Sequence, residues 1–114
     1  MPDLLDRPDP PTAVFAYSDL VALGAIRAAT ERGLRVPEDL AVIGYDDIED
    51  GRYSTPTIST IAPDKAGIAA AAVDRLLERI ELRNDLPGKE IVCPYALIPR
   101  ESTVGSAAGP TRRA

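Results

Sequence analysis

Two adjacent carboxylates, Asp46 and Asp47, follow a short apolar run, and Asp46 is the residue best placed to bind a small molecule. The run from Ala41 to Tyr45 has the composition of a buried strand, so the carboxylates lie where that strand stops. In open α/β sheets, ligands bind just outside the carboxyl ends of the strands. From residue type alone Asp46 is either a ligand contact or a turn carboxylate, and Asp47 is interpreted as a solvated turn residue.

Catalytic and metal chemistry has little support in the composition. The chain has no His, which excludes His-based triads and His-ligated metal sites, and no glycine-rich phosphate motif is present. The single Cys93 offers no thiolate cluster, and its apolar surroundings in the sequence indicate a buried thiol in a reducing compartment. Neighbours on an extended chain point to opposite sides, which is poor geometry for an Asp46–Asp47 acid and base pair. We therefore expect no enzyme, no metal and no cofactor.

The charge balance restricts the partners. The net charge is -5 and the 13 basic residues are scattered, so the footprint of a DNA-binding surface is missing. Aromatic residues make up only 4% of the chain, so the core must be built from Ala, Val, Leu and Ile. Neither a signal peptide nor a membrane-spanning apolar run is visible, and we expect a cytoplasmic protein that does not contact a membrane.

The apolar periodicity predicts the order β-α-β-loop-β-α-β. Strands are expected near residues 12–17, 40–45, 57–61 and 90–99, helices near 20–32 and 63–80, and a loop at 46–56. Pro94 interrupts the last strand and favours an edge position or a bend there. The second helix has the strongest apolar stripe, from Ile68 to Ile80, interpreted as core or lobe packing. A short strand, a helix and another strand in this order call for a parallel pair.

Four stretches occur in a characteristic order along most of the chain. They are Pro11–Asp19 followed by Ala22–Ala25, Gly33–Asp47, Arg52–Ile61 and Ile98–Thr103, and they span roughly residues 8–104. The second contains the Arg-Val-Pro-Glu-Asp and Gly-Tyr-Asp-Asp motifs, which are the most specific of the set. Together these stretches resemble the effector-binding domain of LacI/GalR-type bacterial transcriptional regulators.

The resemblance implies roles for individual residues. Asp46 matches an aspartate that accepts hydrogen bonds from effector hydroxyl or ring N–H groups, as a carboxylate does well. Ser18 matches a position that often faces the ligand, although its residue type equally suits a helix N-cap. Asp19 is interpreted as a capping residue and Tyr45 as packing. Positions near the family's dimer contact are matched by Leu23, Arg27, Arg52 and Tyr53.

The resemblance also implies a fold and a domain organisation. The fold would be α/β and partial periplasmic-binding-protein-like (type I), mainly a parallel sheet flanked by helices, with the ligand cleft between two lobes. Residues 13–103 would form a partial effector-binding domain that includes a helix of the other lobe. By their composition, residues 1–12 are expected to be a polar leader and residues 104–114 a disordered tail.

The implied function is to sense a small-molecule effector, sugar-like or a nucleobase. The protein would act as a homodimer and would reach operator DNA only through an N-terminal helix-turn-helix headpiece that this sequence lacks. A sugar-binding component of a transport system and a truncated remnant without independent function are the alternatives.

Overall fold

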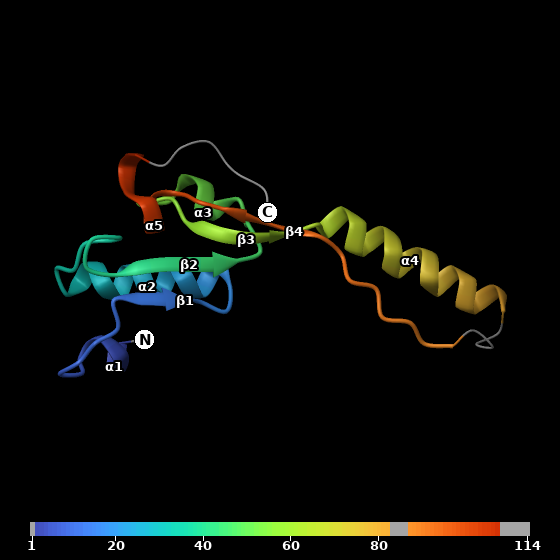
Figure 1. The fold of residues 1–114 in the computed structure, drawn as a ribbon, viewed down its shortest axis with the longest axis horizontal. Coiled ribbons are helices and arrows are strands. Elements are labelled where there is room, and N and C mark those ends of the chain that lie inside the picture. Colours follow the sequence, from blue (N-terminus) through green and yellow to red (C-terminus); the bar gives the residue numbers. More distant parts are fainter. Residues whose placement is uncertain (1, 83–86, 108–114) are drawn as a thin grey trace.

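The computed structural model describes residues 2–82 and 87–107 of the chain. Helices and strands alternate along most of it, as the periodicity predicted (Figure 1). In chain order the elements are α1 (Pro2–Leu5), β1 (Ala13–Phe15), α2 (Asp19–Glu31), β2 (Ala41–Tyr45), α3 (Asp50–Tyr53), β3 (Ser59–Pro63), α4 (Lys65–Glu81), β4 (Tyr95–Ile98), α5 (Glu101–Val104) and the 3₁₀ helix η1 (Gly105–Ala107).

The strands form one sheet in the order β1-β2-β3-β4. The first three are mutually parallel, with Val14 opposite Val42 and Ile43 opposite Ser59, and β4 runs antiparallel to β3. The predicted α/β fold with a mainly parallel sheet is therefore confirmed. Because β1 and β2 are parallel, their carboxyl ends lie at the same edge, and Asp46 follows the end of β2 directly.

The core lies between α2 and the sheet. Alanines on one face of α2 are buried and let the helix backbone approach β2 closely, while Leu40, Val42 and Ile58 are fully buried beneath it. Full burial stabilises each of these larger side chains by about 1.5–3 kcal/mol. The buried alanines of α2 are Ala22, Ala25, Ala28 and Ala29. The core is thus small, aliphatic and confined to this part of the chain.

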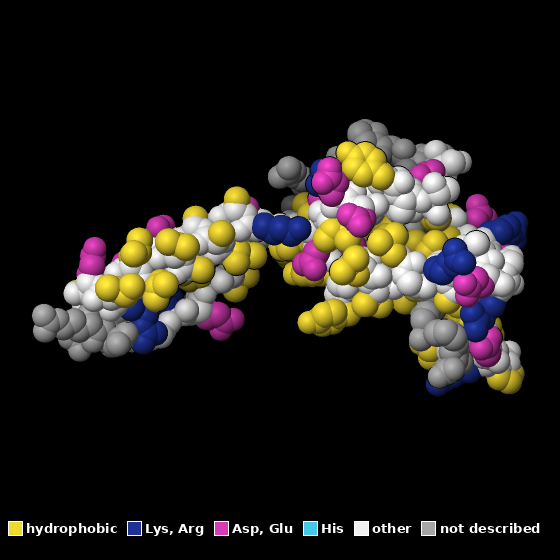
Figure 2. Space-filling model, turned by 180° about the vertical axis from the view of Figure 1, so that it is seen from behind, with side chains coloured by type: hydrophobic (Ala, Val, Ile, Leu, Met, Phe, Trp, Pro, Cys, Tyr) yellow, Lys and Arg dark blue, Asp and Glu magenta, His cyan; other side chains and the backbone are white. Residues whose placement is uncertain are grey.

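Residues 64–82 and 87–94, here called the arm, extend away from the sheet (Figure 1). The radius of gyration is 18.3 Å, whereas a compact chain of this length would have about 13 Å. The apolar stripe of α4 is exposed by 45–62% at Ile68, Val73, Leu76, Leu77 and Ile80. Figure 2 shows hydrophobic side chains gathered along the surface of the arm. The stripe that the sequence assigned to core or lobe packing is therefore uncovered within the described residues.

Two expected elements differ in the structure. The expected loop at 46–56 contains the one-turn helix α3. The expected strand at 90–99 is paired only over Tyr95–Ile98, and Cys93, expected to be buried, is half-buried in the unpaired segment before it. Pro94 has no N–H to donate to a ladder, which accounts for the late start of β4.

The two ends of the chain also differ from expectation. The expected leader at 1–12 contains α1, and Leu5 is buried in the core. The expected tail begins inside helical structure, because α5 and η1 continue to residue 107. The remaining expected tail residues, 108–114, lie outside the described residues. Across the described ranges, no helix combines the length and apolarity needed to cross a membrane.

Candidate functional site

The turn after β2 has an unusual backbone. Asp46 and Asp47 have φ values of 109° and 53°, a region that non-glycine residues rarely adopt. Three successive amides fix this turn: Asp46 N donates to Ile61 O at 2.9 Å, Asp47 N to Thr60 Oγ1 at 3.2 Å, and Ile48 N to Asp19 Oδ2 at 2.9 Å. Such strained backbone persists where the surroundings determine it, and it is concentrated at functional sites.

Asp46 lines a cavity of about 640 Å³ together with Phe15, Tyr17 and Tyr45. These residues come from the carboxyl ends of β1 and β2 and the positions just after them. The volume is in the range that small-molecule sites occupy. Aromatic faces suit the apolar face of a sugar or a base, and the carboxylate can accept hydrogen bonds from hydroxyl or N–H groups. Tyr45, interpreted as packing, is therefore also a cavity residue.

Ser18 is the N-cap of α2. Its Oγ accepts a hydrogen bond from Val21 N at 3.3 Å, and its extended backbone is typical of that position. It is not among the residues that line the cavity with Asp46. The structure therefore supports the capping interpretation of Ser18, and a ligand contact stays a prediction.

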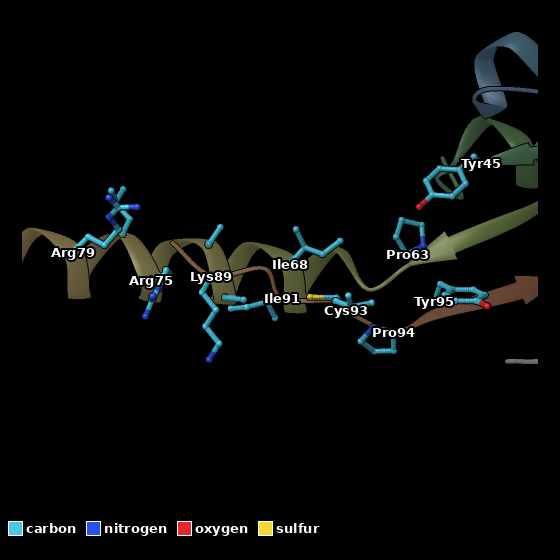
Figure 3. Close-up of a pocket in the computed structure, with 14 residues that line it drawn as sticks. Tyr45, Pro63, Ile68, Arg75, Arg79, Lys89, Ile91, Cys93, Pro94 and Tyr95 are labelled. Carbon is cyan, nitrogen blue, oxygen red and sulfur yellow. The ribbon is translucent and has the colours of Figure 1, made fainter. Parts of the chain in front are cut away.

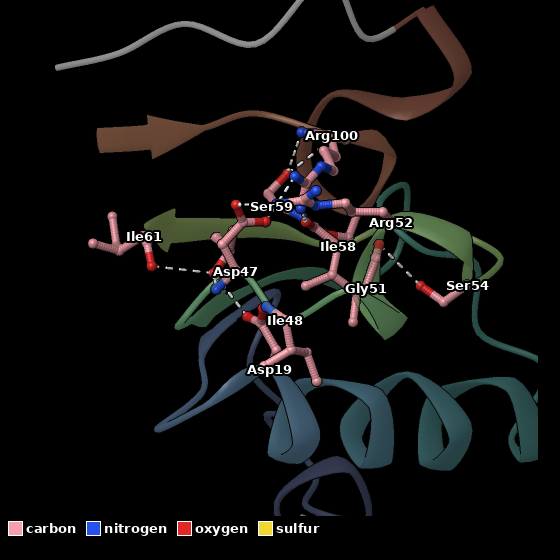
Figure 4. A network of polar contacts seen from close by, with 12 residues as sticks. Asp19, Asp47, Ile48, Gly51, Arg52, Ser54, Ile58, Ser59, Ile61 and Arg100 are labelled. Carbon is pink, nitrogen blue, oxygen red and sulfur yellow. Dashed lines mark hydrogen bonds and ion pairs between the residues drawn. The ribbon is translucent and has the colours of Figure 1, made fainter. Parts of the chain in front are cut away.

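Asp19 is not the cap that the sequence suggested. Its side chain is fully buried and accepts hydrogen bonds from Thr60 Oγ1 at 2.7 Å and from Ile48 N at 2.9 Å. Because the Thr60 hydroxyl donates to Asp19, its oxygen remains free to accept from Asp47 N. Asp19 thus connects α2 to β3 and to the turn after β2 (Figure 4).

Asp47 is not a solvated turn residue either. Its side chain is only 13% exposed and pairs with two arginines, Arg52 Nη2 at 2.9 Å and Arg100 Nη2 at 2.8 Å (Figure 4). Burial raises the pKa of Asp47, but the hydrogen bonds from Arg52 and Arg100 outweigh it and hold the pKa below its ordinary value. Asp47 is therefore a charged carboxylate that pairs with α3 and with the residue just before α5, a role that no local pattern indicated.

The segment around α5 ties the sheet together behind this turn. Ser102 is fully buried; its Oγ donates to Val42 O at 2.6 Å and accepts from Ser59 N at 2.8 Å. Glu101 Oε1 accepts from Thr57 N at 3.1 Å and from its hydroxyl at 2.9 Å. The last stretch of the resemblance, Ile98–Thr103, contains these residues, but no pattern in the sequence indicated which groups they would contact.

The four positions matched to a dimer contact have different surroundings. Leu23 is partly buried against the core, and Arg27 forms an exposed ion pair with Glu31 at 2.8 Å. Arg52 pairs with Asp47, while the Tyr53 ring is 77% exposed. The structure therefore brings Arg52 to the turn after β2 and leaves Arg27 and Tyr53 on the surface.

A second cavity of about 710 Å³ lies between α4 and the returning segment of the arm (Figure 3). It is mainly apolar, with Ile68, Ile91 and Cys93 among its lining residues, and it shares Tyr45 with the first cavity. Within the described ranges, no group of three or more Cys, Asp or Glu side chains could hold a metal ion.

The sequence matches a known protein family and several transcriptional repressors. Residues 2–103 match the family described as periplasmic binding protein-like domain. The ribose operon repressor of Haemophilus influenzae is 49% identical over 72% of this chain and 25% of its own length. The repressor PurR of Escherichia coli O139:H28 is 43% identical over 98% of this chain and 32% of its own length. The chain thus spans about a quarter to a third of these relatives.

Solved structures give the same picture. A LacI-family transcriptional regulator from Sanguibacter keddieii has a TM-score of 0.84 and 42% identity over 91% of this chain and 40% of its own. The lac repressor dimer bound to operator and an anti-inducer has a TM-score of 0.71 and 41% identity over 82% and 32%. A LacI-family regulator from Enterococcus faecium with bound ribose has a TM-score of 0.75 and 35% identity over 89% and 37%. The chain therefore belongs to the periplasmic-binding-protein-like family, in the form found in the effector-binding domain of LacI/GalR-type transcriptional regulators.

Proposed function

We propose that this chain is the effector-sensing and dimerisation part of a LacI-type transcriptional regulator. The observation that carries the proposal is the cavity at the carboxyl ends of β1 and β2, where Asp46 stands among Phe15, Tyr17 and Tyr45. A strained turn holds the carboxylate in place, and the rings offer flat apolar surfaces. This combination suits a small ligand that has a ring face and several hydrogen-bond donors.

A pentose is the effector that we propose first. One relative is named as a ribose operon repressor, and one similar structure contains bound ribose. A sugar ring can place its C–H face on an aromatic side chain while a hydroxyl donates to Asp46. A nucleobase would use ring N–H donors in the same place and is the competing ligand class. The relatives and structures named above are regulators, which favours sensing over transport and over enzyme activity.

Dimerisation would link sensing to regulation. The proposed contact uses the matched positions on α2 and α3, namely Leu23, Arg27, Arg52 and Tyr53. Effector binding would bias the equilibrium between two dimer arrangements, which requires different affinities for them. Contact with operator DNA would be made by a headpiece outside this sequence, and the proposed location is the cytoplasm. No cofactor takes part in this proposal.

The test is calorimetric titration of the chain with D-ribose. Asp46→Asn keeps the size of the side chain but removes its charge and one acceptor, and it should weaken D-ribose binding about tenfold or more. Asp50→Asn is the matched control, because Asp50 is an exposed carboxylate on the nearby α3 and does not line the cavity. Equal affinity in the two variants would contradict the role of Asp46. Binding of hypoxanthine but not D-ribose would assign the site to nucleobases.

A further inference from the structure

We propose that Asp47 is a positioning residue that joins the turn carrying Asp46 to α3, so that binding of a ligand at Asp46 changes the local stability of α3. The inference deepens the proposed function and rests on it where it places the effector at Asp46 and the dimer contact at α3. Its structural part, the joining of the two segments, depends only on contacts within this chain.

Asp46 and Asp47 share a strained stretch of backbone. Asp46 and Asp47 are adjacent and both have positive φ, so one residue of this turn cannot leave its conformation without moving the other. Their amides are anchored on Ile61 and Thr60 of β3. The side chain of Asp47 is therefore aimed by the same backbone that places Asp46 at the cavity.

The Asp47 carboxylate pairs with arginines from two separate segments. Arg52 belongs to α3, and Arg100 is the residue just before α5. The Arg100 guanidinium also donates to Ile58 O at 3.0 Å. The Arg100 side chain is 15% exposed, so this pair lies in a poorly solvated place, whereas Arg52 is half-exposed. The Asp47 carboxylate neutralises two guanidinium groups that would otherwise repel each other. Without it, Arg52 would move away first, and α3 with it, because Arg52 is the more exposed of the two.

Helix α3 is short and has few other side-chain contacts that hold it in place. The helix has four residues, and its N-cap, Glu49, makes no side-chain capping bond. Gly51 O accepts from Ile58 N at 2.8 Å, and Ser54 Oγ contacts Gly51 O and Pro56 O. These bonds hold the end of α3 against the segment that leads to β3. The Arg52–Asp47 pair holds α3 against the turn that carries Asp46. Tyr53, the exposed residue matched to a dimer contact, follows Arg52 directly.

The experiment is NMR-detected amide hydrogen exchange on the whole chain, comparing wild type with Asp47→Asn without ligand. The informative amides are those of Ile48 in the turn, of Arg52 in α3 and of Ser54 just after α3, all of them hydrogen-bonded. We expect all three to exchange about tenfold faster in the variant. The amides of Ala16 and Ala41, which belong to the β1–β2 pair, should not change.

Asp39→Asn is the matched control. Asp39 also pairs with an arginine, Arg35 at 3.0 Å, but this exposed pair lies in the connector before β2 and touches neither segment. Faster exchange confined to the turn and α3 in Asp47→Asn alone supports the link. No change at α3, or an equal rise at every amide, overturns it, because an equal rise would show only a general loss of stability.

A second series adds D-ribose at saturating concentration. In wild type, D-ribose should slow exchange at both Ile48 and Arg52, and in Asp47→Asn it should slow exchange at Ile48 only. A response of Arg52 that persists in the variant overturns the link. If wild type shows no response to D-ribose at all, the proposed pentose effector fails, whereas the ligand-free comparison still decides whether Asp47 joins the two segments.

Discussion

The side chains of Asp19 and Asp47 contact residues that are far away in the sequence. Thr60 Oγ1, the partner of Asp19, lies 41 positions further on, and Arg100, the partner of Asp47, lies 53 positions further on. Local patterns contain no information about such pairs, so the sequence predicts only a cap role for Asp19 and a turn role for Asp47. The ligand contact at Asp46 is predicted from a local rule, the carboxyl end of an apolar strand, together with the family resemblance, and it stays a prediction.

Gly44 gives a prediction at the same scale. A Cβ at this position would lie 2.1 Å from Asp19 Oδ1, and Asp19 is fully buried and cannot move aside. Gly44→Ala should therefore lower the free energy of unfolding by about 1–3 kcal/mol, as measured by urea denaturation. Gly24→Ala is the control, because nothing lies within 4 Å of that position in α2. The control should be neutral or stabilising by up to about 1 kcal/mol; equal losses would contradict the clash with Asp19.

At the scale of elements, the long periodic segments were predictable and the short ones were not. Helices α2 and α4 repeat their apolar positions over several turns, which fixes their type and approximate bounds. Helix α3 has one turn and therefore no period to detect. Strand β4 is limited by its partner, since the β3–β4 ladder runs from Thr60–Ile98 to Pro63–Tyr95. Its start therefore depends on the pairing with β3 as well as on Pro94, which cannot donate to the ladder.

Ser102 gives the prediction for α5. Its buried hydroxyl serves as a donor to β2 and an acceptor from β3, so removing it leaves Val42 O and Ser59 N without that partner. Ser102→Ala should cost about 1–3 kcal/mol in the free energy of unfolding by urea denaturation. Ser106→Ala, in the exposed part of η1, should stay within about 0.5 kcal/mol of wild type. A neutral Ser102→Ala would mean that α5 does not tie the two strands.

At the scale of the whole molecule, the chain exposes more surface than a compact protein of its mass. The accessible area is 7788 Å², whereas a folded monomer of 12.1 kDa has about 6,000 Å². The excess of about 1,800 Å² exceeds the roughly 800 Å² that one partner buries in a standard interface. The apolar periodicity predicted the stripe on α4 correctly. Whether a stripe is buried depends on what packs against it, and a local sequence pattern holds no information about that.

A charge placed on that stripe tests whether the arm is uncovered. Leu77 is 53% exposed, so Leu77→Glu should change the free energy of unfolding by no more than about 0.5 kcal/mol. It should also lower the fluorescence of a dye that binds apolar surface, because it interrupts an exposed apolar patch. Ile58→Ala is the contrasting core variant and should cost about 2–5 kcal/mol. A large loss of stability in Leu77→Glu would show that the stripe is packed in solution.

Strands β3 and β4 pair like the two strands of a β-hairpin, and the arm is an insertion between them. Pro63 and Tyr95 are cross-strand partners, so the chain leaves the sheet and returns to it at the same place. Everything between them could be replaced by a two-residue turn such as Asn-Gly without altering the pairing of either strand. The sheet, α2 and the turn that holds Asp46 would then form a smaller unit, closed by a tight loop and free of the exposed stripe.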